Sequence, residues 1–129
     1  MSVNIDAGLY YYKAELVKVV DGDTVDLVVS LGFYVTMQRR FRLLGINSPE
    51  TNASDPTVRQ AATAAKLALE GFVSGASQEG RLRGRTVKDS ADKYGRYLVV
   101  LLVVDTTGAV ILDVNAAMIA GGYAVPYLP

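Results

Sequence analysis

The 129-residue chain contains neither cysteine nor histidine. Without cysteine, a disulfide, a thiolate zinc site and a cysteine nucleophile are all excluded. Without histidine, the chain lacks the commonest general base and the commonest transition-metal ligand, so acid–base chemistry falls to Asp, Glu, Lys, Tyr or water. Any metal site must therefore use oxygen ligands, which favour calcium, magnesium or manganese over zinc and copper.

Long apolar runs and an excess of one charge are also missing. The longest apolar run, residues 98–104, is far too short to span a bilayer. The first residues show no positive segment before an apolar core, so we expect no signal peptide, no membrane partner and a cytoplasmic or virus- or phage-encoded protein. Thirteen basic and thirteen acidic residues cancel. This balance argues against a protein that coats nucleic acid and favours a localised basic site.

Apolar periodicity predicts a mainly β chain of the α+β class. The length predicts one domain over residues 1–129, which we expect to be monomeric. Strands are expected at residues 10–20, 25–29, 33–44, 81–87 and 97–104, with a bulge at residues 38–40 and a loop at residues 45–54. One helix is expected from the N-cap Asp55 to Gly75, and another over residues 114–120 after the N-cap Asp113. This order fits a five-stranded Greek-key barrel of the OB type with two to three helices.

Three polar islands, residues 21–24, 42–50 and 92–96, interrupt the apolar runs. Asp21 and Asp23 flank Gly22, which fits either a simple turn or a pair of ligands for a hard cation. In the second island, Arg42 ends a strand and Glu50 follows Pro49, which stiffens the loop and holds the glutamate in place. Taken singly, Arg42 fits a solvated charge at the end of a strand, and Glu50 fits an exposed loop carboxylate.

The third island by itself fits an ordinary charged hairpin that leads to Arg96. Arg81, Arg83 and Arg85 alternate along one predicted strand face. A solvated face is the favoured interpretation there, and a nucleic-acid track is the other.

Taken together, the islands resemble those of the staphylococcal nuclease family. The matching stretches are residues 20–25, 41–44, 48–51, 92–96 and 114–117, in the same order across about residues 12–127. The resemblance implies an OB-fold barrel with calcium-dependent endonuclease activity on DNA and RNA, preferably single-stranded. It also implies little sequence specificity, with products that end in a 3′-phosphate and a 5′-hydroxyl on the leaving strand.

The resemblance assigns the metal ligands position by position. Asp23 corresponds to a direct calcium ligand, and Asn47 stands where the family has an aspartate ligand. Ser48 stands at a threonine that ligates through its backbone carbonyl, and Asp21 is expected to support the metal through water.

The same resemblance assigns the catalytic and substrate-binding residues. Glu50 matches the glutamate proposed as general base, and Arg42 and Arg96 match the two arginines that grip phosphate. Lys93 and Tyr94 match residues that bind the terminal phosphate of a nucleotide, and Tyr127 matches an aromatic wall for a base.

Asn47 departs from the family pattern, because an amide keeps the oxygen donor but loses one charge. This departure has three possible outcomes. The enzyme needs more metal, it prefers another hard cation, or the protein keeps the fold and has lost the catalytic activity. Retention of Arg42, Glu50 and Arg96 favours the first. Two other functions stay open: a non-catalytic nucleic-acid-binding OB module, and a structural or assembly component, for instance of a virus particle, that uses residues 10–12 and 125–129 as contact surfaces.

Overall fold

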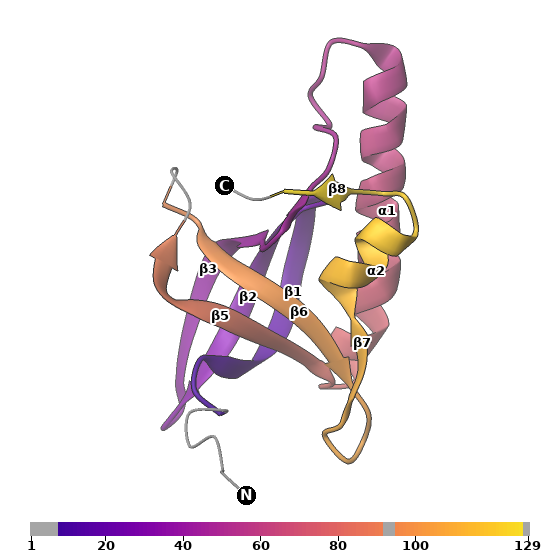
Figure 1. The fold of residues 1–129 in the computed structure, drawn as a ribbon. Helices are drawn as coiled ribbons and strands as arrows, with labels where there is room; N and C mark the ends of the chain where they lie inside the picture. The colour runs from indigo at the N-terminus through magenta and orange to yellow at the C-terminus, as the bar shows by residue number, and fades with distance from the viewer. Residues whose placement is uncertain (1–7, 92–94, 128–129) are drawn as a thin grey trace, which may run out of the picture.

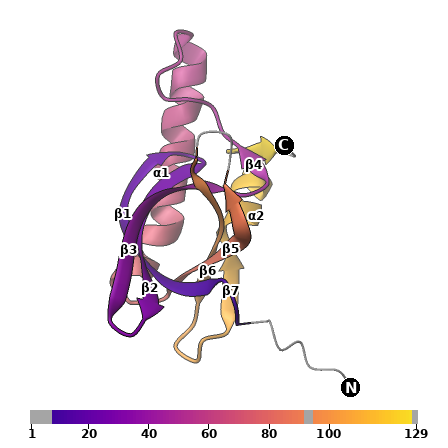
Figure 2. The same cartoon turned by 90° about the vertical axis from the view of Figure 1, so that its left-hand side faces the viewer.

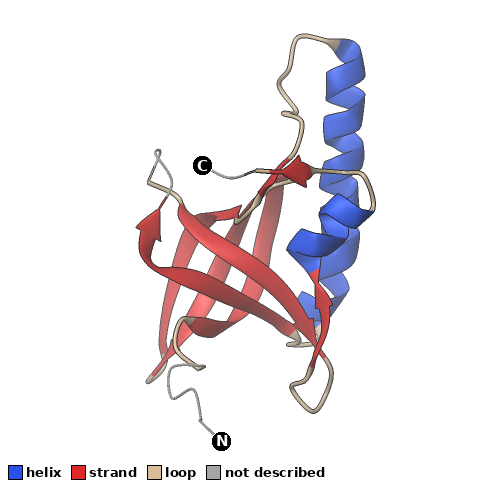
Figure 3. Cartoon of the chain, in the orientation of Figure 1, coloured by secondary structure: helices blue, strands red, loops and turns tan. Residues whose placement is uncertain are grey.

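The computed structural model describes residues 8–91 and 95–127, and their side chains except those of residues 88–91. In this part of the chain, two helices pack beside a strongly twisted sheet (Figures 1 and 3). The elements are β1 (Tyr11–Asp21), β2 (Thr24–Gly32), β3 (Val35–Leu43), β4 (Ile46–Asn47), α1 (Pro56–Gln78), β5 (Leu82–Ala91), β6 (Tyr97–Val104), β7 (Val110–Asp113), α2 (Val114–Ala120) and β8 (Val125–Pro126).

Five of these strands close into a barrel. Antiparallel neighbours follow the order β3-β2-β1-β5-β6, and a parallel pairing of β3 with β6, with Phe41 opposite Tyr97, completes the ring. The ring is visible in Figure 2, with α1 behind it. Strand β7 adds to the far side of β6, and β4 pairs with β8 in a separate two-stranded sheet. The predicted mainly β barrel of the OB type with two helices is therefore confirmed.

Strand alternation fills the barrel. On β2, Val25, Leu27 and Val29 are buried, whereas Asp26 points outward and pairs with Arg40 at 2.8 Å. Other buried side chains in the same core include Phe41, Leu43, Val99, Leu101 and Val103.

Helix α1 begins where the sequence predicts, because the Asp55 side chain accepts a hydrogen bond from the backbone N–H of Thr57. Its buried face against the barrel consists of Ala62, Ala65, Leu69, Val73 and Ala76. The predicted end at Gly75 is wrong, since the helix continues to Gln78. One glycine costs a helix only about 1 kcal/mol, and the chain turns away at Gly80, whose φ is +73°. None of the described helices is long and apolar enough to cross a membrane.

Helix α2 confirms its predicted range, with Asp113 accepting a hydrogen bond from the N–H of Ala116. Its buried Asn115 donates to the carbonyls of Leu44 and Val99 and accepts from the N–H of Leu101. This side chain fastens the helix to the point where β3 leaves the barrel.

Two predictions about irregular segments are wrong. Residues 38–40 form no bulge, because β2 and β3 keep one register from Thr24 opposite Arg42 to Ser30 opposite Thr36. The expected loop at residues 45–54 contains β4, where Ile46 pairs with Pro126 and Asn47 with Val125. Strands of two to four residues, such as β4, β7 and β8, are too short to show alternation in a sequence.

Candidate functional site

The turn between β1 and β2 packs tightly against helix α1 and the loop after β4. A Cβ placed on Gly22 would lie 2.7 Å from the Cβ of Ala65 and 2.9 Å from the Oγ of Ser48. Such distances leave no space for a side chain, so only glycine allows this approach. The carboxylates of Asp21 and Asp23, on either side of Gly22, are thereby brought to the loop after β4.

Asp23 is buried, with 6% of its surface exposed, and both of its carboxylate oxygens have partners. Oδ2 accepts hydrogen bonds from Nη1 of Arg42 at 3.1 Å and from the N–H of Ser48 at 3.0 Å. Oδ1 accepts from the hydroxyl of Thr24 at 2.9 Å. The structure thus brings together three residues that the sequence analysis assigned to the site, and it adds Thr24, for which no role was predicted.

Arg42 also reaches the loop on the other side. Its Nη2 donates to the carbonyl of Ile46 at 3.0 Å and to Oδ1 of Asn47 at 3.2 Å. The ring of Tyr127 lies against the guanidinium, with its centroid 5.1 Å away. Tyr127 is held there because its N–H donates to the carbonyl of Gly45, next to the β4–β8 pair. The Arg42 guanidinium is therefore surrounded by oxygen groups and has an aromatic ring beside it.

Asp21 ties the turn to the loop that carries Glu50. Its Oδ1 accepts from the hydroxyl of Thr51 at 2.8 Å and from the Thr51 N–H at 3.4 Å. The Glu50 carbonyl accepts a hydrogen bond from the N–H of Ala53. The Glu50 side chain is exposed and makes no hydrogen bond or ion pair with any described group.

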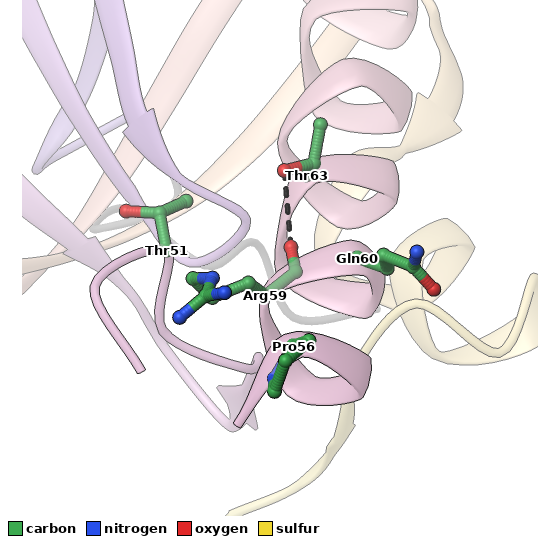
Figure 4. A pocket seen from close by; sticks show the side chains of 5 residues that line it. All are labelled: Thr51, Pro56, Arg59, Gln60 and Thr63. Atoms are coloured by element: carbon green, nitrogen blue, oxygen red, sulfur yellow. Dashed lines mark hydrogen bonds between the residues drawn. The ribbon is translucent and has the colours of Figure 1, made fainter. Parts of the chain in front are cut away.

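Arg59 fixes the far part of the same loop, a role that the sequence analysis missed. Its Nη1 donates to the carbonyls of Ala53 and Ser54 at 3.1 and 3.0 Å. Beside it, a shallow pocket of about 440 Å³ is lined by Thr51, Pro56, Arg59, Gln60 and Thr63. Figure 4 shows the Arg59 side chain on the side of Thr51, while Gln60 points away. The sequence shows Arg59 only as an arginine early in a predicted helix, and this position does not indicate that its side chain reaches the loop.

Arg96 directly precedes β6, whose first residue Tyr97 pairs with Phe41, the chain neighbour of Arg42. Its side chain is half-buried and has an interaction partner. The backbones that carry the two arginines therefore run next to each other. Lys93 and Tyr94 lie outside the described residues.

The groups suited to a metal are all oxygen donors: the Asp23 and Asp21 carboxylates, Oδ1 of Asn47 and the carbonyl of Ser48. This donor set fits a hard cation such as calcium. Among the described residues, however, no three acidic side chains converge. Arg42 donates to Asp23 and Asn47 at once, so a metal ion bound by these two residues would have to share their oxygens with the guanidinium.

Comparison with known proteins adds one finding. A family model described as "Staphylococcal nuclease homologue" matches residues 40–128. The matched segment contains Arg42, Asn47, Glu50, Arg96 and Tyr127, whereas the Asp21–Asp23 turn precedes it. No curated protein matches the chain.

Proposed function

The chain belongs to the staphylococcal nuclease family, whose model matches more than half of it, and we propose that it is a calcium-dependent nuclease cleaving DNA and RNA, preferably single-stranded, with little sequence specificity. The main support is the cluster of Arg42, Asp23 and Asn47 at one rim of the barrel, next to the loop that carries an exposed Glu50. In OB folds, the loops between strands 1–2 and 4–5 border the oligonucleotide site. Here these are the β1–β2 turn and the connection from β5 to β6.

The arginines are proposed to bind the phosphodiester. When water attacks phosphorus, negative charge grows on the non-bridging oxygens, and a guanidinium matches their geometry with two parallel donors. Arg42 is held on one side by Asp23 and on another by Tyr127. Its bond to the exposed Asn47 is the one that a phosphate oxygen would replace. Arg96 is proposed as the second phosphate ligand.

Glu50 is proposed as the general base. Its carboxylate is exposed and without a partner among the described residues, so it is available to accept a proton from an attacking water. The water oxygen bonds to phosphorus as its proton passes to Glu50, the bond to the 5′-oxygen breaks, and that oxygen takes a proton from solvent water and leaves as a 5′-hydroxyl. The other product ends in a 3′-phosphate. A positioned base is typically worth about 10²–10⁴ in rate.

Calcium would be held by Asp23, Asn47 and the Ser48 carbonyl, with Asp21 supporting it through water. When bound, it would stabilise the negative charge of the transition state and lower the pKa of a coordinated water. Tyr127 is proposed to border a base, and Lys93 and Tyr94 to bind a terminal phosphate.

A second candidate is a non-catalytic nucleic-acid-binding OB module. It is favoured by Asn47, which leaves the site one carboxylate short, and by the hydrogen bonds of Arg42 to two proposed ligands. The same contacts are compatible with a nuclease of low calcium affinity.

Incubation of single-stranded DNA with the purified protein in millimolar calcium, with and without excess chelator, separates the two functions. Cleavage that stops in chelator supports the nuclease, and a Glu50→Gln preparation controls for contaminating enzyme. Binding without cleavage in calcium, magnesium and manganese supports the second candidate. Cleavage that persists in chelator contradicts the metal role.

A further inference from the structure

A group of positive side chains lies on the outer face of β1 and β5, away from the candidate active site. In the antiparallel register, Lys13 is opposite Arg83 and Tyr11 is opposite Arg85. Directly opposed side chains share a face. Their chain neighbours Ala14 and Leu82 are buried in the core, so this face is the outer one. We call Tyr11, Lys13, Arg83 and Arg85 the basic strip.

Lys13 and Arg83 place two positive charges side by side on this face. The Nη1 of Arg83 donates to the carbonyl of Gly80 at 2.9 Å, and the Lys13 ammonium lies 3.5 Å from where a Cβ on Gly80 would stand. Both cations therefore lie beside Gly80, and like charges directly opposite each other destabilise a sheet. Between described side chains, no ion pair includes Lys13 or Arg83. A bound anion would remove this repulsion.

An aromatic side chain lies within the same group. The guanidinium of Arg85 is 4.9 Å from the ring centroid of Tyr11, which is half-buried. Cations interleaved with aromatic rings are typical of proteins that bind single-stranded nucleic acid, where phosphates meet the charges and bases stack on the rings.

The strip is well separated from the candidate active site. Lys13 precedes Asp21 by eight residues of the same strand, which at about 3.3 Å per residue allows a separation of at most roughly 26 Å. A single nucleotide cannot reach both places, whereas OB folds bind about 4–16 nucleotides of a single strand.

We propose that the basic strip is a second, non-catalytic site that binds the backbone phosphates of a single-stranded nucleic acid whose other part occupies the candidate active site. We name nucleic acid, and not another polyanion, as the ligand of the strip because of the proposed nuclease function. The strip strengthens binding of long substrates and leaves the turnover of very short ones unchanged.

The test is the salt dependence of binding to a labelled single-stranded DNA of about 30 nucleotides, measured in chelator so that no cleavage occurs. Each lost phosphate contact lowers the slope of log K against log salt by about 0.7. The variant Lys13→Ala/Arg83→Ala/Arg85→Ala is therefore expected to lose about 2 from the slope. A charge-matched control, Lys18→Ala/Arg39→Ala/Lys66→Ala, is expected to keep it.

Because Arg83 also holds two backbone carbonyls, its loss could disturb the fold. The variant Lys13→Gln/Arg85→Gln retains Arg83 and is expected to lose about 1.4 from the slope. Unchanged slopes in both strip variants, or an equal loss in the control, would overturn the proposal. So would a strip variant that loses binding to anionic vesicles but keeps its DNA slope. Since binding is measured without cleavage, a failed nuclease assay alone leaves this test intact.

Discussion

Arg42 donates a 3.1 Å hydrogen bond to Asp23, and the two side chains are only 12% and 8% exposed. This ion pair joins the end of β3 to the β1–β2 turn, at the rim where the candidate active site lies. The proposed phosphate-binding arginine is therefore also part of the structure that holds a proposed metal ligand. Substitutions at this pair are expected to change stability as well as activity.

Arg42→Ala is expected to lower the free energy of unfolding by about 1–3 kcal/mol, because it leaves a buried carboxylate without its cation. Asp23 keeps its bonds from Ser48 and Thr24, which limits the loss. In an Asp23→Asn background the same substitution should cost less, with a coupling energy of at least about 1 kcal/mol by urea denaturation. The control Arg40→Ala breaks a more exposed pair and should cost about 0–1 kcal/mol. Additive effects of Arg42→Ala and Asp23→Asn would contradict the role of the pair.

Asn47→Asp is expected to lower the calcium concentration for half-maximal activity, since it adds a carboxylate beside Asp23 and Ser48. The same variant should show a larger rise in melting temperature when calcium is added, because at a given concentration a tighter ligand stabilises the folded state more. Asn52→Asp adds the same charge in the exposed part of the loop and serves as the control. Identical calcium titrations for wild type and Asn47→Asp would show that this position is not a ligand.

Glu50→Gln is expected to reduce turnover about 10²–10⁴-fold, the usual contribution of a general base. Its stability should change by less than about 0.5 kcal/mol, because the side chain is exposed. Glu15→Gln, an exposed acid on β1, should leave both quantities unchanged. Near-normal turnover in Glu50→Gln with single-stranded DNA would refute the assignment.

Gly22→Ala is expected to destabilise the protein by about 1–3 kcal/mol, as overpacking does, because its Cβ would collide with Ala65 and Ser48. Gly75→Ala should have the opposite effect. Its Cβ meets nothing within 4 Å, and alanine is about 0.8–1 kcal/mol better than glycine inside a helix. Thermal unfolding of the two variants measures both signs, and a loss of stability in Gly75→Ala would contradict the helix as described.

The contribution of the Arg40–Asp26 pair is expected to depend on pH. The hydrogen bond from Arg40 holds the pKa of Asp26 below its usual value. A carboxyl with a lowered folded-state pKa contributes stability above its unfolded pKa and loses it as pH falls through the folded value. The difference in stability between wild type and Arg40→Ala should therefore be present at pH 6, begin to decline at about pH 4, where the aspartate of the unfolded chain protonates, and disappear only below the lowered pKa of the folded Asp26. If the difference persists at acidic pH, the stabilisation comes from packing of the Arg40 side chain and not from the ion pair.

Features that depend only on residues close to each other along the chain were predictable from the sequence. Alternation located four of the barrel strands and a nearly continuous apolar run located β6. Asp55 and Asp113 marked the starts of α1 and α2. The end of α1 was missed because a helix held by a buried face tolerates an exposed Gly75. Strand β4 was missed because two residues carry no period.

The sequence by itself determined the kind of chemistry available: oxygen ligands, arginines and a carboxylate, without histidine or cysteine. Only the tertiary structure decided which of these groups meet. The β4–β8 pair places Tyr127 on Arg42, and Arg42 bridges Asp23 to Asn47. The β1–β5 register sets Lys13 against Arg83. Such contacts depend on which distant segments pair and on how the barrel closes. The alternation along a strand shows which of its faces is buried, but it does not name the partner strand.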